Sequence, residues 1–154
     1  MSAVIIKVTG HPRPQPRPRA FRGIIVSTAD KNAKLWQKQI QAACAEALIH
    51  NNCTRFEKGS ALSLKAIFQM PTKVKKRWGK PHTSRPDVDN LLKLAMDQIS
   101  ATDIMPEDSH IWETQAVKIW SEQHGAIFVI EEKETSSVLD RLVEIPSTRP
   151  HWLG

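Results

Sequence analysis

Few cysteines, no long hydrophobic run and no internal repeat characterise this sequence, and each absence excludes a class of protein. The 154 residues include two cysteines, Cys44 and Cys53, which are too few for the disulfide framework of a small secreted domain. Their spacing does not match a zinc site. The N-terminus lacks the apolar core of a signal peptide, and no segment is long and apolar enough to span a bilayer. We therefore expect a protein of the reducing cytoplasm without a membrane partner.

The charge balance favours a polyanionic partner. The chain has 22 Lys and Arg residues against 16 Asp and Glu residues, a formal net charge of +6. Such a balance fits nucleic acid, although merely soluble basic proteins share it. The hydrophobic content of 40% and the length suit one domain with a real core.

The hydrophobic pattern predicts an α+β fold in a single small domain, with a mixed sheet of about five strands and two main helices. Strands are expected at residues 3–9, 21–26, 62–70, 111–120 and 126–131, with helices at 29–50 and after residue 89, in β-β-α-β-α-β-β order. The first two strands should form a broad hairpin, and the last two an antiparallel hairpin across Gly125. Ser27, Thr28 and Asp30 are candidate caps for the first helix. Its predicted buried face consists of Trp36, Ile40, Ala43, Cys44, Ala47 and Leu48.

The stretch RPDVDNLLK at 85–93 combines two carboxylates with one ammonium group. On an extended chain Asp87 and Asp89 point to the same side, and a helix with Asp89 or Asn90 as its cap would follow. If Asp89 caps, Lys93 lies about one turn beyond it on the same side. Hard cations such as Mg²⁺ take carboxylate oxygens. The turn from extended chain to helix at 85–93, called the corner below, is therefore a candidate metal site. Asp residues are also common at helix starts because they cap and complement the dipole, and the stretch alone leaves both interpretations open.

A third carboxylate comes from further along the chain. Glu107 and Asp108 follow Pro106 and directly precede the expected strand at 111–120. A strand start is a rigid place from which to aim a side chain, so Asp108 is the candidate third ligand. Asp97 and Asp103 are interpreted as structural or solvated.

Two basic segments flank these acidic residues. The first, at 10–19, alternates four prolines with basic or polar residues, which makes it stiff and extended. It is either a soluble connector or an arm whose arginines contact phosphates: Arg13, Arg17 and Arg19. The second is a loop around Trp78 with Lys73, Lys75, Lys76, Arg77 and Lys80. It is either solvated or a nucleic-acid contact in which Trp78 stacks on a base.

Together these residues resemble the RusA family of endodeoxyribonucleases, which resolve Holliday junctions. The resemblance rests on the 85–93 motif, on Glu107-Asp108-Ser109 some twenty positions later, and on the Pro-Arg-Pro-Arg stretch at 16–19. It implies that Asp87, Asp89 and Asp108 take the family's metal-binding and catalytic positions and that Lys93 takes its essential lysine. Glu107 departs from an Asp-Asp pair that the family often shows. The resemblance also implies a homodimer.

The expected function is therefore Mg²⁺-dependent resolution of four-way DNA junctions by paired symmetric nicks, with Mn²⁺ as a substitute ion. Alternatives are a less selective nuclease for branched DNA and a basic DNA-binding protein without catalysis; an RNA-binding protein is weaker, because no recognisable single-strand RNA module is present. The origin is expected to be bacterial, prophage or phage. The nuclease domain should cover residues 1–132, and residues 133–154 should form an extension with a short helix at 138–145 and a loose end.

Overall fold

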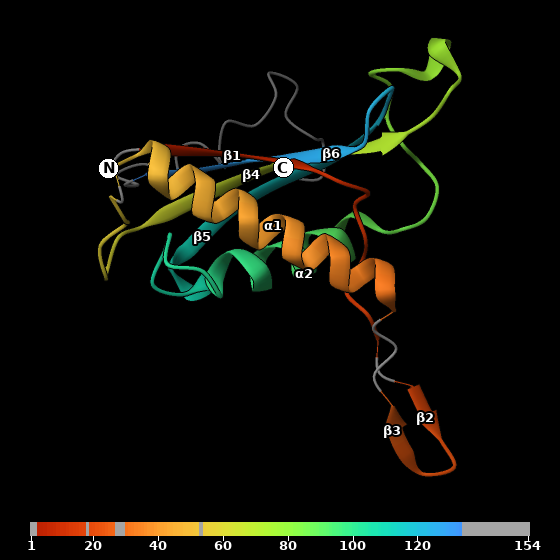
Figure 1. Ribbon diagram of the computed structural model, residues 1–154, viewed down its shortest axis with the longest axis horizontal. Helices are drawn as coiled ribbons and strands as arrows, with labels where there is room; N and C mark the ends of the chain where they lie inside the picture. The colour runs from red at the N-terminus through yellow and green to blue at the C-terminus, as the bar shows by residue number, and fades with distance from the viewer. Residues whose placement is uncertain (1–2, 18, 27–29, 53, 134–154) are drawn as a thin grey trace, which may run out of the picture.

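The computed structural model describes residues 3–17, 19–26, 30–52 and 54–133 (Figure 1). Its main sheet has four strands in the order β1-β6-β4-β5. These are β1 (Ala3–Thr9), β4 (Leu62–Pro71), β5 (Ile111–Ser121) and β6 (Gly125–Glu132). Two helices, α1 (Lys31–His50) and α2 (Val88–Ser100), complete the domain. The predicted α+β class with a mixed sheet and two main helices is confirmed, with four strands in the sheet rather than about five.

The pairing of the last two strands differs from the predicted hairpin. β6 pairs antiparallel with both β1 and β4, whereas β5 pairs in parallel with β4. β4 therefore lies between β5 and β6, and the short turn before Gly125 connects strands that are not neighbours. The reason lies upstream, because α2 connects β4 to β5 and a helical crossover returns the chain parallel to the strand that it left.

The predicted strand at 21–26 is also wrong. The segment contains a turn, and β2 (Arg19–Phe21) and β3 (Ile24–Val26) pair with each other in a separate two-stranded sheet (Figure 1). Arg22 and Gly23 both have positive φ, 50° and 78°, which suits the tight turns that close two-residue hairpins. β1 consequently has β6 as its partner and not this segment.

Both helices cover one face of the main sheet. Asp30 caps α1, because its Oδ1 accepts a hydrogen bond of 2.7 Å from the Ala33 amide; two other candidate caps, Ser27 and Thr28, lie outside the described residues. The predicted stripe of α1 faces the core, with Trp36 fully buried. Cys44 is a buried free thiol whose pKa is raised by burial to about 11, which agrees with the structural role predicted for it. None of the described helices is long and apolar enough to cross a membrane.

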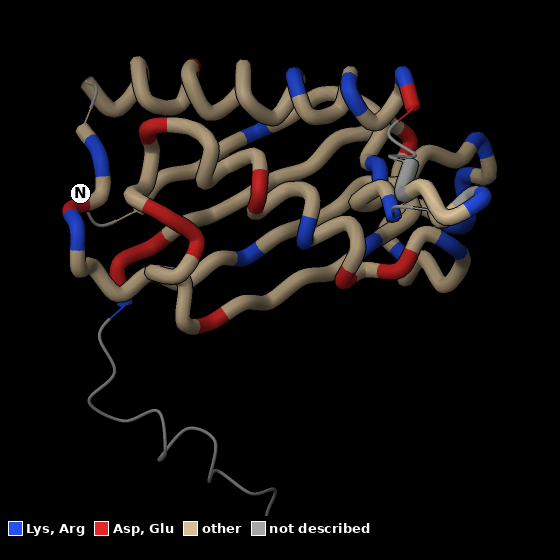
Figure 2. The backbone as a smooth tube through the Cα atoms, turned by 90° about the horizontal axis from the view of Figure 1, so that it is seen from below, with Lys and Arg blue, Asp and Glu red and all other residues tan. Residues whose placement is uncertain are grey.

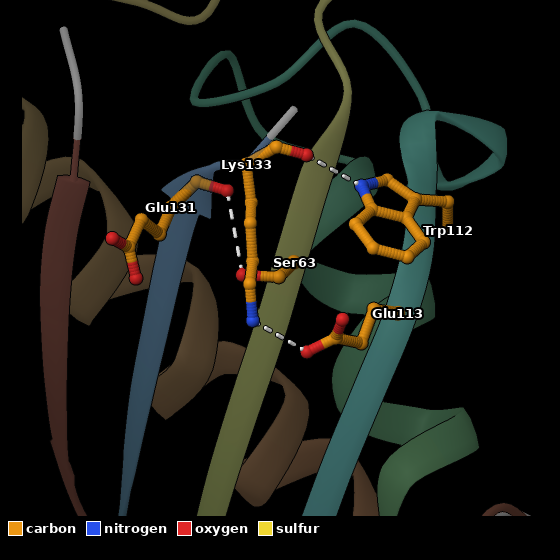
Figure 3. A network of polar contacts seen from close by, with 5 residues as sticks. All are labelled: Ser63, Trp112, Glu113, Glu131 and Lys133. Atoms are coloured by element: carbon orange, nitrogen blue, oxygen red, sulfur yellow. Dashed lines mark hydrogen bonds and ion pairs between the residues drawn. The ribbon is translucent and has the colours of Figure 1, made fainter. Parts of the chain in front are cut away.

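A polar cluster joins the end of β6 to β5 (Figure 3). Lys133 Nζ lies 2.9 Å from Glu113 Oε1, and Trp112 Nε1 donates to the Lys133 carbonyl over 3.0 Å. Ser63 Oγ contacts the Glu131 carbonyl at 3.5 Å. The cluster reaches across β4, so Lys133 is tied to the sheet. The helix predicted at 138–145 lies outside the described residues.

The centre of the core generates a stability prediction. Phe68 is fully buried and meets the Phe128 ring edge-on, with centroids 5.7 Å apart. Phe68→Ala is expected to lower the free energy of unfolding by about 3–5 kcal/mol, because truncation leaves a cavity. The neighbouring Ile67 points to the face opposite the helices and is 36% exposed, so Ile67→Ala should cost only about 1 kcal/mol. Urea unfolding measures both, and equal losses would contradict this assignment of faces.

Candidate active site

The corner that carries Asp87 and Asp89 is the start of α2. Asp87 is the N-cap, with extended backbone (φ −69°, ψ 144°), and the Leu91 amide makes the first helical hydrogen bond to its carbonyl. The prediction that the chain stays extended to Asp89, with Asp89 or Asn90 as the cap, is therefore wrong. Asp89 lies in the first helical turn, because the helix starts as soon as the chain has passed Pro86. Lys93 keeps its predicted place one turn beyond Asp89.

Neither carboxylate is used for capping. The Asp87 side chain accepts no cap hydrogen bond, and both Asp87 and Asp89 are exposed. No ion pair joins Asp89 to Lys93 among the described residues. The two alternatives to a ligand role, a side-chain cap and a helical ion pair, are thus not formed. The carboxylates remain open to a cation at the positive end of the α2 dipole.

Lys118 of β5 positions this corner. Its Nζ donates to the carbonyl of Ser84 and, over 2.7 Å, to the carbonyl of Pro86, the residue before Asp87. The main chain adds to this attachment, since the His82 amide donates to the Lys118 carbonyl over 3.0 Å. Lys118 thereby connects the sheet to the residue that carries the first carboxylate.

His82 and Trp120 stabilise the same attachment. The buried His82 ring lies against Trp120, with centroids 4.2 Å apart. Burial, and after it the charge of Lys118, lowers the pKa of His82. A neutral His82 adds no charge next to Lys118.

The proline-arginine arm lies beside the corner although some 70 positions separate them in the sequence. The Gln15 amide donates to the Asn90 carbonyl over 3.0 Å. Arm and corner together enclose a cleft of about 620 Å³, lined by Pro14, Gln15, Pro16, Arg17, Arg85, Pro86, Asp87 and Asn90. Two cationic side chains therefore border the cleft that contains Asp87. Arg13 also lies on the arm, and its buried Nε has no hydrogen-bond partner among the described residues. Arg19 begins β2.

The basic loop at 72–80 forms a second cationic region. Its centre is a 3-10 turn, η1 (Lys75–Arg77), and Lys73, Lys75 and Lys76 are exposed. Figure 2 shows Lys and Arg crowding the right-hand end of the molecule, while several Asp and Glu residues lie at the left-hand end. Near Asp87 the cations that the structure places closest are Arg17 and Arg85, which line the same cleft.

Trp78 and Arg77 make contacts inside the protein. Trp78 Nε1 donates to the Thr72 carbonyl over 2.9 Å, which is the contact of a loop anchor. The Arg77 guanidinium lies 5.5 Å from the Trp120 ring centroid. Contact of either side chain with DNA stays a prediction.

Asp108 is far from Asp87 within the chain. It opens a 3-10 turn, η2 (Asp108–His110), which leads into the first residue of β5. Pro86, the residue before Asp87, contacts Lys118 near the other end of β5. Strands rise about 3.3 Å per residue, so the strand from Ile111 to Lys118 is roughly 23 Å long. Accordingly, no group of three His, Cys, Asp or Glu side chains able to hold a metal is found among the described residues. The structure brings Asp87, Asp89 and Lys93 together but does not bring Asp108 to them.

Three residues of this region had no assigned role in the sequence analysis: Gln15, Arg85 and Lys118. The sequence of β5 did contain a signal for Lys118. Side chains alternate between the two faces of a strand, and Ala116 and Lys118 point to the helix-covered face. A lysine on a covered face calls for partners such as the two carbonyls it contacts. Gln15 gave no such signal, since its contact with α2 depends on the path of the arm.

Exposed carboxylates at a helix start, bordered by arginines, define a candidate metal-assisted site for a phosphate polyanion. The chain belongs to the RusA endodeoxyribonuclease family, whose model, described as endodeoxyribonuclease RusA, matches residues 9–131. It is also 39% identical over 77 residues to a protein of Lactococcus phage r1t described as crossover junction endodeoxyribonuclease rusA. That match covers 50% of this chain and 59% of the relative. The chain thus spans less than two thirds of the curated relative's length.

Replacing Lys118 tests whether it positions the corner. Lys118→Met keeps most of the side-chain volume but removes the donor to two carbonyls. We expect the free energy of unfolding to fall by about 1.5–3 kcal/mol, the range for hydrogen bonds to charged groups. Amide exchange of the peptide covering residues 83–91 should accelerate, as measured by mass spectrometry. Lys65→Met, an exposed lysine on the adjacent strand, is the control, and equal exchange in both variants would refute the positioning role.

Proposed function

We propose that this chain is a Mg²⁺-dependent endodeoxyribonuclease that resolves four-way (Holliday) junctions by paired symmetric nicks. The observation that carries the proposal is the start of α2, where Asp87 and Asp89 are exposed and unused beside a cleft bordered by Arg17 and Arg85. A phosphodiester is anionic, so carboxylates alone would repel it, and the arginines supply the opposite charge. Membership of the family supports the choice of DNA as the substrate.

Mg²⁺ fits the donors at this corner. The ion prefers oxygen ligands and is usually held by one or two carboxylates while it keeps several waters. Asp87 and Asp89 provide two such carboxylates at one helix start, and Mn²⁺ accepts the same ligands. When bound, the ion would supply a Lewis acid that lowers the pKa of water and neutralises charge on the phosphate.

The surrounding cations would orient the DNA. Lys93 is exposed one turn beyond Asp89, and as a protonated ammonium it is a phosphate contact rather than a metal ligand. Arg17 and Arg85 would hold phosphates of the strand to be cut, since guanidinium groups bind phosphate in a bidentate manner. Arg13 and Arg19 would continue this contact along the arm, and the 72–80 loop would hold a neighbouring DNA arm.

The third carboxylate of each site is assigned to Asp108 of a second copy. Within one chain Asp108 lies at the opposite end of β5 from Asp87, so it cannot complete its own site without unfolding α2. In a two-fold homodimer, Asp108 of each copy could lie beside Asp87 and Asp89 of the other copy, so that each site combines residues of both chains. It also offers two sites in matching orientation, which paired nicks in a four-way junction require.

Mixing two inactive variants tests this assignment. Asp87→Asn and Asp108→Asn should each abolish Mg²⁺-dependent nicking of a labelled four-way junction, because each removes a carboxylate from both sites. A mixed dimer of the two variants keeps one intact site. An equimolar mixture should therefore regain roughly a quarter of the wild-type sites and leave single nicks, as mapped on denaturing gels.

The matched control is a mixture of Asp87→Asn with Asp89→Asn, in which both sites of every dimer stay damaged. Asp103→Asn should remain active, because Asp103 is exposed and pairs with Arg55 at 3.5 Å. No recovery in the first mixture would show that Asp108 acts within its own chain or not at all.

The salt dependence of binding tests the basic loop. Changing Lys73, Lys75 and Lys76 to Gln should flatten the slope of log K against log salt by about 2–3 units, since each phosphate contact contributes about 0.9. The loss should be similar for junction arms of any sequence, because phosphate contacts do not read bases. Fluorescence anisotropy between 50 and 200 mM salt, the range over which about 10³–10⁵ in affinity is typically lost, measures the slope. The same change at Lys7, Lys58 and Lys65, exposed lysines outside the loop, is the control for net charge.

A second candidate function is junction binding without catalysis. It is favoured by the absence of a three-ligand metal cluster among the described residues. It predicts unchanged binding and no nicking in Mg²⁺, in every mixture above.

We further propose a phage or prophage origin and a reducing compartment. A phage relative and the free thiol of Cys44 support these two proposals. The division into residues 1–132 and 133–154 is kept as a proposal, with the family match ending at residue 131 as its support.

A further inference from the structure

The face of the main sheet opposite the helices has a patch of apolar side chains. Both described helices lie on the other face (Figure 1). Side chains alternate along a strand, so residues next to the buried ones point away from the helices. The strand register brings the apolar members of this face into neighbouring rows, and we call them the open-face patch: Ile5, Ile67, Val117, Ile119, Ile127 and Val129. Three of them, Ile5, Ile67 and Val117, are 57%, 36% and 41% exposed.

The described part of the chain ends on this same face. Lys133 directly follows β6, and the alternation of that strand puts its side chain on the side of the open-face patch. Its N–H donates to the Ala61 carbonyl over 2.9 Å, and its carbonyl accepts from Trp112 Nε1 over 3.0 Å. Its ammonium group reaches across β4 to Glu113 (Figure 3). The chain therefore continues from a fixed point at one end of the open-face patch.

The sequence that follows, residues 134–154, contains an amphipathic pattern. At the helical period of about 3.6 residues, the apolar residues of segment 138–145 fall on one side: Val138, Leu139, Leu142, Val143 and Ile145. The charged residues Asp140, Arg141 and Glu144 fall on the other side. Ser137, with Asp140 three positions later, is a candidate cap, and Pro146 ends the pattern. A helix this short is marginal in water alone, so its apolar side calls for a surface to pack on.

We infer that segment 138–145 of the same chain packs as a helix on the open-face patch. The lengths agree. Residues 134–137 allow a reach of up to about 18 Å from Lys133, whereas Val129 lies about 13 Å from Lys133 along β6. A helix that begins there extends about 12 Å further, over the row of Ile127 and Ile67. A segment tethered in this way has an effective concentration in the millimolar range, which favours it over a free partner.

The inference does not depend on the proposed function. Neither experiment below involves DNA, so a failure of the nuclease assays would leave it standing.

Thiol labelling measures whether the patch is covered. Ile67→Cys, in a Cys53→Ser background, introduces one reactive thiol into the patch, because the remaining Cys44 is buried. In the full chain this thiol should react slowly with a maleimide, as followed by mass spectrometry. Adding Leu142→Asp should raise the labelling rate by about tenfold or more, because a carboxylate on the apolar side of the segment would have to be buried on packing.

Arg141→Asp is the matched control for Leu142→Asp, because it introduces the same residue on the charged side of the segment. It should leave the labelling rate of Ile67→Cys unchanged. A thiol outside the patch, Ile49→Cys on α1, where Ile49 is 69% exposed, should react equally fast with either Asp variant. Equal labelling of Ile67→Cys in the Leu142→Asp and Arg141→Asp chains would overturn the inference.

A tether between two cysteines identifies what covers the patch, and it decides the matter if labelling of Cys44 reveals that Leu142→Asp unfolds the chain. A short bis-maleimide should join Ile67→Cys to Leu142→Cys within one chain, in a yield that does not change on dilution. Ile49→Cys with Leu142→Cys is the control pair and should not be joined, because α1 lies on the other face of the sheet. Equal yields for the two pairs, or products that contain two chains, would refute the inference; the latter would assign the patch to a second copy.

Discussion

The parallel pairing of β4 with β5 is the constraint on which the arrangement of the candidate site depends. A parallel pair needs a crossover, and α2 supplies it. The carboxylates at the start of α2 therefore lie at one end of β5, and Asp108, which precedes β5, lies at the other. No side-chain rotation can close a gap that is the length of a strand. Within one chain the three carboxylates therefore do not meet, which is why the proposed function assigns Asp108 to a second copy.

Electrostatics explains how the carboxylates at the α2 start could lie in the proposed DNA-binding surface. The positive end of the helix dipole favours Asp87 and Asp89 there. Arg17 and Arg85 border the same cleft, so the local field is set by cations as well as carboxylates. Lys118 acts differently, because its ammonium is used on two carbonyls of the chain. It therefore holds the main chain before Asp87 in position and is not counted among the proposed DNA contacts.

The sequence predicted the elements better than their partners. Helix α1 with its buried face, and the strands β1, β4, β5 and β6, follow from residue periodicity, which is a local property. The hairpin expected from β5 and β6 was wrong because strand order is decided by where α2 returns the chain. The strand expected at 21–26 was wrong because Arg22 and Gly23 adopt positive φ and turn the chain. Both errors concern which strands pair. Periodicity shows which face of a strand is buried, but not which strand lies beside it.

The chemistry of the site was determined by the sequence alone: two carboxylates and a lysine within seven residues, a later acidic pair, and two basic segments. Residue type decides charge and ligand preference whatever the fold. Only the tertiary structure decided which of these groups meet. It placed the arm against α2 through Gln15 and Asn90, fastened the corner to Lys118, and separated Asp108 from Asp87. Distances between residues far apart in a chain depend on strand order and direction, and these are set by packing of the whole core.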